Sequence, residues 1–364
     1  MIPEAHGETC RLGYLKVVAA LKEQGLPNLT AISGKLLDFA RSLEGLRRAP
    51  KPPGLLTKSK QTAFYYAVLA RELGILNEYL PMISALPSYE KVRALVREFL
   101  SNGMAPEAHE AIVTPSLGEK VVLAYILSRR DPLFVELMRW AKNAKQFKRM
   151  QAIEHGLKDI MPRIWPDAAE KFRKYSEELE ASSPAEAIRS RAYNAGRHLI
   201  SPRLEWAVDL GLLRRCVGGG AGARTNSYEA APLLDRILPA LEGLGAVPLD
   251  APCDGETIRL FDQLVSAYAG EGRRCISARP KAVEEALRDA HAILSKAGPV
   301  PILALLVAAS ARLLDAGLAA AVAEAKEVLT RMIFVNMTPY YRPLPSGSIA
   351  IESLDPPPCY VTPY

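Results

Sequence analysis

The chain has 364 residues, of which 49% are hydrophobic, and it carries a formal net charge of +6 with a sequence pI near 9.0. This length suits two or three domains, and the apolar content excludes a chain that is disordered over most of its length. A positive charge of this size permits an anionic partner without requiring one.

Three features of the composition bear on the cellular setting. Residues 1–14 lack the basic and apolar regions of a secretory signal. The longest apolar run, residues 299–311, is well short of the ~20 residues that cross a bilayer. The five cysteines form no CxxC pair, which is typical of reduced thiols. We therefore expect a soluble, cytoplasmic protein with no membrane partner.

Apolar residues recur at helical spacing in many segments, among them residues 12–19, 122–127 and 302–313, which predicts a mainly α, multi-domain protein. Clusters of Gly and Pro indicate loops and place domain boundaries near residues 105 and 250. The predicted parts are a helical domain over 1–105, a second over 106–250, a third over 251–333, and an extended Pro- and Tyr-rich tail over 334–364.

The first helices are expected over residues 11–24 and from Lys58 to Gly74. The second of these begins with Lys58, Lys60 and Gln61 and ends in the phrase ARELGIL at residues 70–76. Glycine is favoured where a helix ends because it accepts a left-handed backbone conformation.

A basic stretch follows at residues 139–149, where the spacing of three to four residues predicts one cationic helix face. Trp140 and Phe147 lie between the cations, and at helical spacing such aromatic rings more often fill a core than stack on bases. The basic residues of the stretch, which we expect to contact nucleic acid, are Arg139, Lys142, Lys145, Lys148 and Arg149.

Between residues 165 and 250 the elements are expected to be short. Ser183-Pro184 begins a predicted helix through Gly196, and Ser201-Pro202 begins another that ends at Gly211. The phrase AVDLGLL at residues 207–213 repeats the A-x-x-L-G-[IL]-L pattern of residues 70–76. Residues 212–217 and 223–228 then predict a hairpin with a Gly-rich tip, and a helix follows over 231–241.

Two helices, this phrase, a basic hairpin and a further helix resemble the winged helix-turn-helix superfamily. The resemblance covers roughly residues 183–242 and, in a weaker form without a basic hairpin, residues 11–100. It implies a wing that meets phosphates or the minor groove and helix N-termini that meet phosphates and base edges. The contacts that the resemblance implies are Arg214, Arg215 and Arg224 on the wing, Arg203 on the preceding helix, and Lys58, Lys60 and Gln61 on the earlier helix.

The charges near this unit argue in two directions. Arg189, Arg191 and Arg197 add to a basic stretch that continues to Arg224 and would neutralise phosphates. Glu205 and Asp209, however, lie on the helix that would approach DNA, where they would repel phosphate unless they face inward or sideways. Winged helices also serve as protein-interaction modules.

The last third is again helical, over residues 255–270, 279–297, 301–315 and 318–333. Residues from about 333 onward are rich in Pro and Tyr and carry no amphipathic helix. This tail either lies extended over the body or reaches a protein partner.

Enzyme motifs are sparse. Gly218-x-Gly220-x-x-Ala223 formally fits a dinucleotide fingerprint, but no βαβ pattern surrounds it, so a wing tip is favoured. The five histidines are dispersed and none stands at metal-ligand spacing. We expect no enzyme, no cofactor and no metal.

The sequence therefore predicts a double-stranded DNA-binding protein, such as a transcription regulator or an accessory factor of a DNA-processing system. The alternative is a non-enzymatic scaffold whose helical and winged-helix-like domains dock proteins, with the tail as a ligand segment. Steep salt dependence of binding to an unspecific duplex distinguishes the first from the second.

Overall fold

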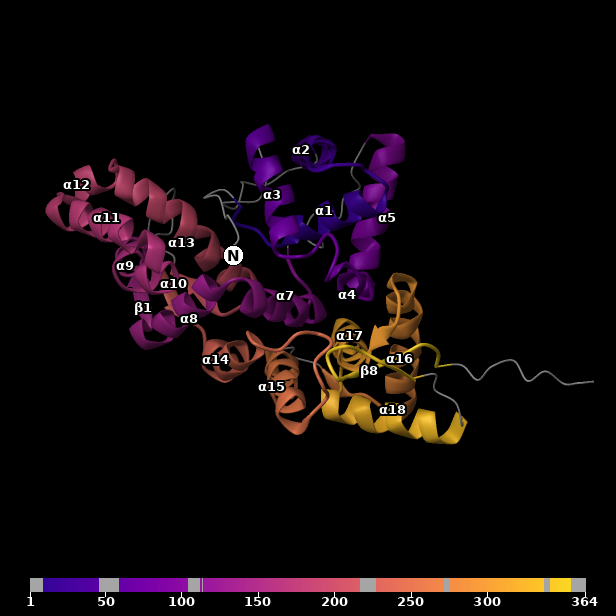
Figure 1. Cartoon of the computed structure of the whole chain (residues 1–364). Helices are drawn as coiled ribbons and strands as arrows, with labels where there is room; N and C mark the ends of the chain where they lie inside the picture. Colours follow the sequence, from indigo (N-terminus) through magenta and orange to yellow (C-terminus); the bar gives the residue numbers. More distant parts are fainter. Residues whose placement is uncertain are drawn as a thin grey trace, which may run out of the picture. The chain divides into compact units, whose positions relative to one another are not determined.

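The computed structural model describes residues 9–45, 59–103, 112, 114–216, 227–271, 275–336 and 341–354 (Figure 1). Helices dominate these residues, and the strands are short. The expected mainly α class is therefore confirmed.

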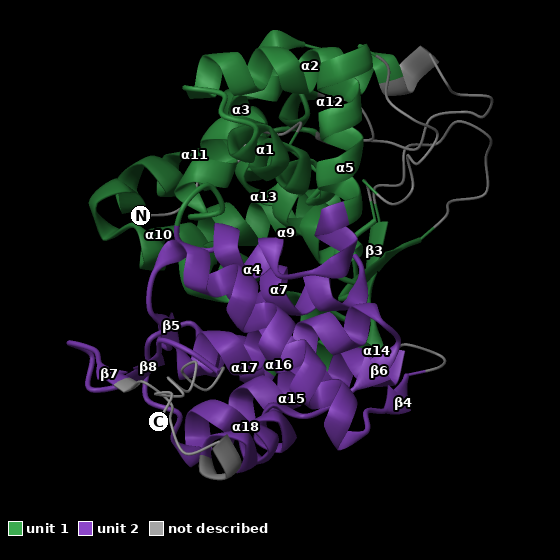
Figure 2. Cartoon of the chain, turned by 90° about the vertical axis from the view of Figure 1, so that its right-hand side faces the viewer, with its two compact units in different colours: residues 1–77, 91–115, 126–238 green, residues 78–90, 116–125, 239–364 purple. Residues whose placement is uncertain are grey.

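The chain divides into two compact units (Figure 2). Unit 1 comprises residues 1–77, 91–115 and 126–238, and unit 2 comprises 78–90, 116–125 and 239–364. This division differs from the predicted one. Residues on both sides of position 105 belong to unit 1, and the last break between the units follows residue 238, before the boundary expected near 250.

The amino-terminal part of unit 1 is a helical cluster. Its helices are α1 (Gly13–Glu23), α2 (Leu29–Gly45), α3 (Lys60–Glu72) and α5 (Pro87–Asn102), of which α5 begins in unit 2. Aromatic side chains pack between them, with ring centroids 5.1 Å apart for Tyr14 and Tyr66 and 5.2 Å apart for Phe39 and Phe99. The Ser59 hydroxyl accepts a hydrogen bond from the Thr62 amide at 3.1 Å, so α3 begins at a conventional N-cap.

The rest of unit 1 contains helices around a small sheet. Its helical elements are the end of α7 (Leu117–Arg130), α8 (Pro132–Ala144), α9 (Arg149–His155), a π-helical turn (Gly156–Ile160), α10 (Met161–Ile164), a 3₁₀ turn (Pro166–Ala168), α11 (Ala169–Ala181), α12 (Pro184–Ala187), α13 (Arg191–Asp209) and the first part of α14 (Pro232–Leu244).

The predicted hairpin is present, and a third strand joins it. Strands β2 (Leu213–Arg215) and β3 (Ser227–Ala230) are antiparallel, and β1 (Gln146–Lys148) pairs with the other edge of β3. The strand order is β1-β3-β2. The Gly-rich tip, residues 217–226, lies outside the described residues and includes Arg224.

The two copies of the A-x-x-L-G-[IL]-L phrase end their helices in the same way. Gly74 has φ +74° and Gly211 has φ +80°. In each copy the amide that follows the glycine bonds a carbonyl five residues back: Ile75 to Ala70 and Leu212 to Ala207, both at 2.8 Å. These are Schellman-type ends, and the left-handed conformation explains why glycine stands at both positions.

The prediction of two helices, over 183–196 and 201–211, is wrong. Ser183 and Glu186 form a capping box, but α12 ends at Ala187, and a new helix begins after Ser190, whose hydroxyl accepts from the Tyr193 amide at 2.9 Å. Helix α13 then continues through Pro202 to Asp209. Residues 200–207 are all buried, so surrounding packing maintains the helix across a proline that would otherwise favour a break.

The basic stretch at residues 139–149 is not one helix face. Helix α8 ends at Ala144, and Lys145 adopts φ +58° as the chain turns into β1. Lys148 therefore lies in a strand, and Arg149 begins the next helix. Phe147 is buried in β1 and contacts Trp140, with ring centroids 4.6 Å apart. Both aromatic residues are thus part of a packed cluster.

Unit 2 is a second helical group. Three helices lie partly in it: the start of α5, the first part of α7 through Tyr125, and the end of α14. Its complete helical elements are α4 (Leu80–Ser84), α15 (Gly255–Glu271), α16 (Pro280–Leu294), a 3₁₀ turn (Ser295–Ala297), α17 (Ile302–Asp315) and α18 (Val322–Asn336). The four helices expected after residue 250 are therefore present. The apolar run that begins near residue 300 forms α17, in which most residues are buried.

Short strands complete unit 2. Strands β4 (Ile276–Ser277) and β6 (Leu318–Ala319) are parallel. Strand β8 (Ile349–Ile351) pairs with both β5 (Val300–Pro301) and β7 (Tyr341–Pro343), each in antiparallel register. Ala350 and Ile351 are fully buried. Residues 341–351 of the tail are thus packed within unit 2.

Candidate nucleic-acid interface

Helix α13 has two halves with opposite environments. In the carboxyl-terminal half, residues 200–207 are buried, and in the amino-terminal half Arg191, Asn194 and Arg197 are exposed. The two acidic residues of the helix, Glu205 and Asp209, both belong to the buried half. This division decides which predicted contacts are available to a ligand.

Arg203 is an internal structural residue. Its side chain and that of Asp131 are both 0% exposed, and the guanidinium binds the carboxylate through two nitrogens at 2.9 and 3.1 Å. It also donates to the Leu199 carbonyl at 2.5 Å. The Asp131 carboxylate additionally caps α8 by accepting from the Phe134 amide at 3.0 Å. Arg203 therefore cannot contact DNA in this fold, and its assignment as a contact is corrected.

The buried Glu205 carboxylate binds two other predicted contacts, Arg149 and Arg215. It pairs with Arg215 and lies 3.5 Å from Arg149, and the Tyr228 hydroxyl donates to it at 2.6 Å. Arg149 also donates to the Tyr228 hydroxyl at 2.9 Å. Burial, with the negative charge of Glu205, raises the pKa of Tyr228. Arg149 and Arg215 thus neutralise an internal carboxylate. The sequence predicted that both guanidinium groups face a ligand, whereas in the structure they face Glu205.

Asp209 anchors the start of the described chain to α13. Its carboxylate accepts from the Leu12 amide at 2.9 Å and pairs with Arg11 at 3.1 Å. Next to it, the Trp206 indole donates to the Thr9 carbonyl at 2.7 Å. Burial raises the pKa of Asp209 to about 6, although Arg11 opposes this shift. The carboxylates that sequence reasoning regarded as an obstacle to DNA binding therefore face inward.

The exposed half of α13 carries cations that pair with no carboxylate of the described residues. Arg191, Asn194 and Arg197 are spaced three residues apart and so lie along one side of the helix. Arg189, in the preceding turn, is also exposed. Within the described part of the chain, none of the three arginines forms an ion pair. We call Arg189, Arg191, Asn194 and Arg197 the α13 surface.

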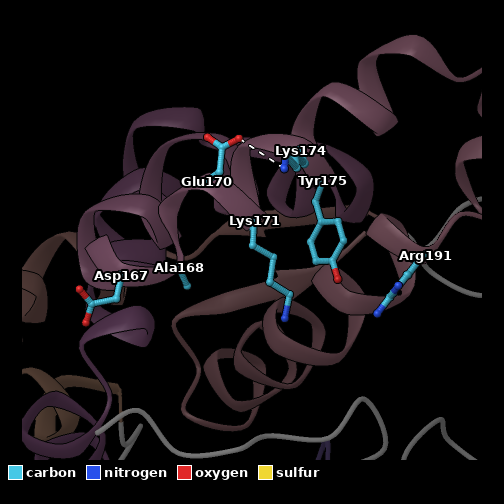
Figure 3. A pocket seen from close by; sticks show the side chains of 7 residues that line it. All are labelled: Asp167, Ala168, Glu170, Lys171, Lys174, Tyr175 and Arg191. Carbon is cyan, nitrogen blue, oxygen red and sulfur yellow. Dashed lines mark ion pairs between the residues drawn. The ribbon is translucent and has the colours of Figure 1, made fainter.

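A pocket of about 510 Å³ lies between α11 and the start of α13 (Figure 3). Lys171, Tyr175 and Arg191 extend toward the same open space, while Asp167 lies at the opposite end. The Lys171 ammonium lies 5.8 Å from the centre of the Tyr175 ring. The residues that line the pocket are Asp167, Ala168, Glu170, Lys171, Lys174, Tyr175 and Arg191.

Three predicted cations are exposed around the small sheet. Lys145 precedes β1, Lys148 ends it, and Arg214 is the middle residue of β2. Among the described residues none of them forms an ion pair. One exposed carboxylate, that of Glu229, stands directly across the strands from Arg214. The outer face of the sheet is therefore mainly but not wholly cationic.

The remaining predicted contacts are dispersed. Arg139 pairs with Glu136, and Lys142 lies 3.6 Å from Asp235. Lys60 and Gln61 are exposed at the start of α3, where the Gln61 amide donates to the Tyr65 hydroxyl at 3.0 Å. Lys58 lies outside the described residues, as does Arg224.

Sequence reasoning placed three arginines of the α13 surface in a basic stretch but did not choose them as contacts. The signal was the absence of acidic residues between Arg189 and Arg203, in contrast to Glu205 and Asp209 further on. Lys171 and Tyr175 were missed altogether, because α11 mixes both signs of charge and reads as an ordinary solvated helix.

Comparison with protein-family models, with curated proteins and with solved structures found no match. The described residues contain no helix long and apolar enough to cross a membrane. Within the same residues, no three His, Cys, Asp or Glu side chains gather as metal ligands would.

Proposed function

We propose that the chain is a DNA-binding protein and that the α13 surface is its principal contact with the duplex. The observation that carries this proposal is the division of α13. In its amino-terminal half the exposed residues are Arg191, Asn194 and Arg197, and both of its carboxylates are buried in the other half.

The order of elements supports the proposal. The resemblance to winged helix-turn-helix proteins implies two helices over residues 183–211 followed by a hairpin. The chain has the short α12, helix α13 and the β2–β3 hairpin in that order, although the break between the helices falls at Ser190 and not at Ser201. In helix-turn-helix proteins, the amino-terminal residues of the second helix contact base edges in the major groove. Arginine and asparagine are the residue types that read guanine and adenine there.

The surroundings of α13 fit phosphate contacts. Lys171 is exposed on α11 and borders the same pocket as Arg191. Lys145, Lys148 and Arg214 add exposed positive charge near the hairpin. Because each phosphate contact releases counterions, binding should weaken steeply as salt rises.

The test is a salt titration with the full chain and an unspecific duplex, followed by fluorescence anisotropy. The double variant Arg189→Gln/Arg197→Gln should flatten the slope of log K against log salt by about two units. The matched control, Arg259→Gln/Arg331→Gln, removes the same charge from exposed helix positions of unit 2 and should leave the slope unchanged. Equal slopes for the two double variants would contradict the proposal.

The runner-up is a protein-interaction scaffold. The packing of residues 341–351 into a sheet with β5 argues against the use of that part of the tail as a ligand segment. If the full chain fails to bind any duplex at about 50 mM salt, where phosphate contacts are strongest, the scaffold becomes the better function.

A further inference from the structure

We propose that the pocket lined by Lys171, Tyr175 and Arg191 is a phosphate site that holds one backbone phosphate of the bound DNA. The phosphate chemistry follows from the pocket alone, whereas the DNA as its source rests on the proposed function. We call this site the α11 pocket.

The cations of the α11 pocket differ from their neighbours on the same helix. Arg173 pairs with Glu170 and Glu177, and Lys174 lies 3.6 Å from Glu170. Within the described part of the chain, Lys171 and Arg191 form no ion pair. Two cations from different helices therefore border one concave space, and neither is in an ion pair with a described carboxylate.

The groups that reach this space match the oxygen atoms of a phosphate. Figure 3 shows the Lys171 ammonium, the Tyr175 hydroxyl and the Arg191 guanidinium directed to the same side. An ammonium supplies a compact charge, a guanidinium binds two oxygens at once, and a phenol donates a third hydrogen bond. Arg191 is also the first residue of α13, where the partial positive charge of the helix favours an anion.

The opposite end of the α11 pocket limits the size of the anion. Asp167 lies at that end, whereas Glu170, which also lines the pocket, is paired with Arg173 at 2.7 Å and with Lys174 at 3.6 Å. A chain of two or three phosphates would extend toward the Asp167 carboxylate and be repelled. A single phosphate at the Lys171–Arg191 end avoids it. This favours a phosphodiester, or a free phosphate ion, over a nucleoside triphosphate.

The position of the α11 pocket relative to the α13 surface is what a backbone contact requires. Arg191 belongs to both, and Asn194 follows it by one helical turn. A phosphate held at Arg191 would therefore fix the entry of α13 into a groove. Such a contact positions the protein without reading sequence.

The experiment uses the full chain, an unspecific duplex and three single variants. Lys171→Gln should flatten the salt slope by about one unit, and Tyr175→Phe should weaken binding several-fold with little change of slope because no charge is lost. The control Lys281→Gln removes an exposed charge in unit 2 and should change neither quantity. Chain integrity is checked by circular dichroism, since Lys171 is exposed and its loss should not affect folding.

The outcomes separate the pocket from the proposed function. If Lys171→Gln binds as the wild type does while Arg189→Gln/Arg197→Gln flattens the slope, the α11 pocket proposal is overturned and DNA binding stands. A second arm titrates inorganic phosphate against the wild type and Lys171→Gln by NMR. Phosphate binding that depends on Lys171, together with no binding of a duplex, would keep the phosphate site but overturn DNA as its source. Failure of both arms would overturn both proposals.

Discussion

At the scale of single residues, the arginines of unit 1 divide according to their partners. Arg203, on the buried half of α13, is bound to Asp131, and Arg215, in β2, is bound to Glu205. The arginines on the α13 surface have no such partner within the described residues. Residue type alone does not distinguish the two groups. The net charge of a segment therefore overstates the number of cations that are available to bind a polyanion.

The buried pair Asp131–Arg203 should be costly to break. Arg203→Met leaves the Asp131 carboxylate without its partner at 0% exposure, and we expect the free energy of unfolding to fall by about 3–5 kcal/mol. Adding Asp131→Asn should recover much of this loss, because a neutral amide oxygen still accepts from the Phe134 amide. Urea unfolding of the two variants measures the difference, and an equally unstable double variant would contradict the explanation.

Asp209 should make stability depend on pH in a direction opposite to most carboxylates. Its pKa is about 6 in the folded chain and near 3.8 when exposed, so the unfolded state binds fewer protons between these values. Stability from this group is therefore fully present below pH 4 and is lost as pH rises through 6, by about 3 kcal/mol in total.

The comparison with Asp209→Asn isolates this contribution. The difference in unfolding free energy, wild type minus variant, should decrease between pH 4 and pH 7, since only the wild type must ionise a buried side chain. Urea midpoints at four or five pH values measure it. A difference that is constant over this range would show that Arg11 fully compensates the burial.

At the scale of elements, sequence reasoning was most accurate where periodicity and capping agree. Helices α3, α15, α16 and α17 lie close to their predicted bounds, and Gly74 and Gly211 have the expected left-handed conformation. It failed at Ser201-Pro202 because a local helix-start signal was overridden by burial of residues 200–207. It also failed at residues 139–149, where β1 is a strand only because β3, some 80 residues later, pairs with it. Contacts between distant segments carry no local signal, and the α11 pocket depends on such contacts.

Gly118 should be among the least replaceable residues of unit 2. A Cβ atom at this position would overlap the Ala311 carbonyl oxygen of α17 and lie 2.6 Å from Asp315 Oδ1. Asp315 itself accepts from the Gly118 amide at 2.9 Å and from the Ser88 hydroxyl at 2.5 Å, so it joins the starts of α5 and α7. Gly118→Ala must separate α7 from α17. This should lower the free energy of unfolding by about 3 kcal/mol, at the upper end of the usual cost of overpacking.

The control for this substitution is Gly34→Ala in α2. A Cβ atom there meets no heavy atom within 4 Å, and alanine within a helix should stabilise by about 0.5–1 kcal/mol. Thermal unfolding of both variants measures the contrast. A tolerated Gly118→Ala would mean that α7 and α17 can move apart at little cost.

At the scale of the whole molecule, the features that favour nucleic acid belong to unit 1. The chain passes between the units several times, so neither unit is a continuous segment that could be removed without cutting the other. Function must therefore be tested by substitution in the full chain. Three of the cations that the sequence predicted as contacts, Arg149, Arg203 and Arg215, are bound to internal carboxylates, whereas Arg191 and Arg197 of the α13 surface are exposed.

Glu229 offers a test of whether the sheet also faces the polyanion. It is exposed between β1 and β2, opposite both Gln146 and Arg214. If phosphates approach this face, Glu229→Gln removes a repulsion and should tighten binding by about threefold at low salt, with the gain fading as salt screens the charge. Glu327→Gln, an exposed carboxylate on α18 of unit 2, is the matched control and should have no effect. Tighter binding by Glu229→Gln alone would extend the interface from α13 to the sheet, whereas equal affinity for both variants would confine it to the helices.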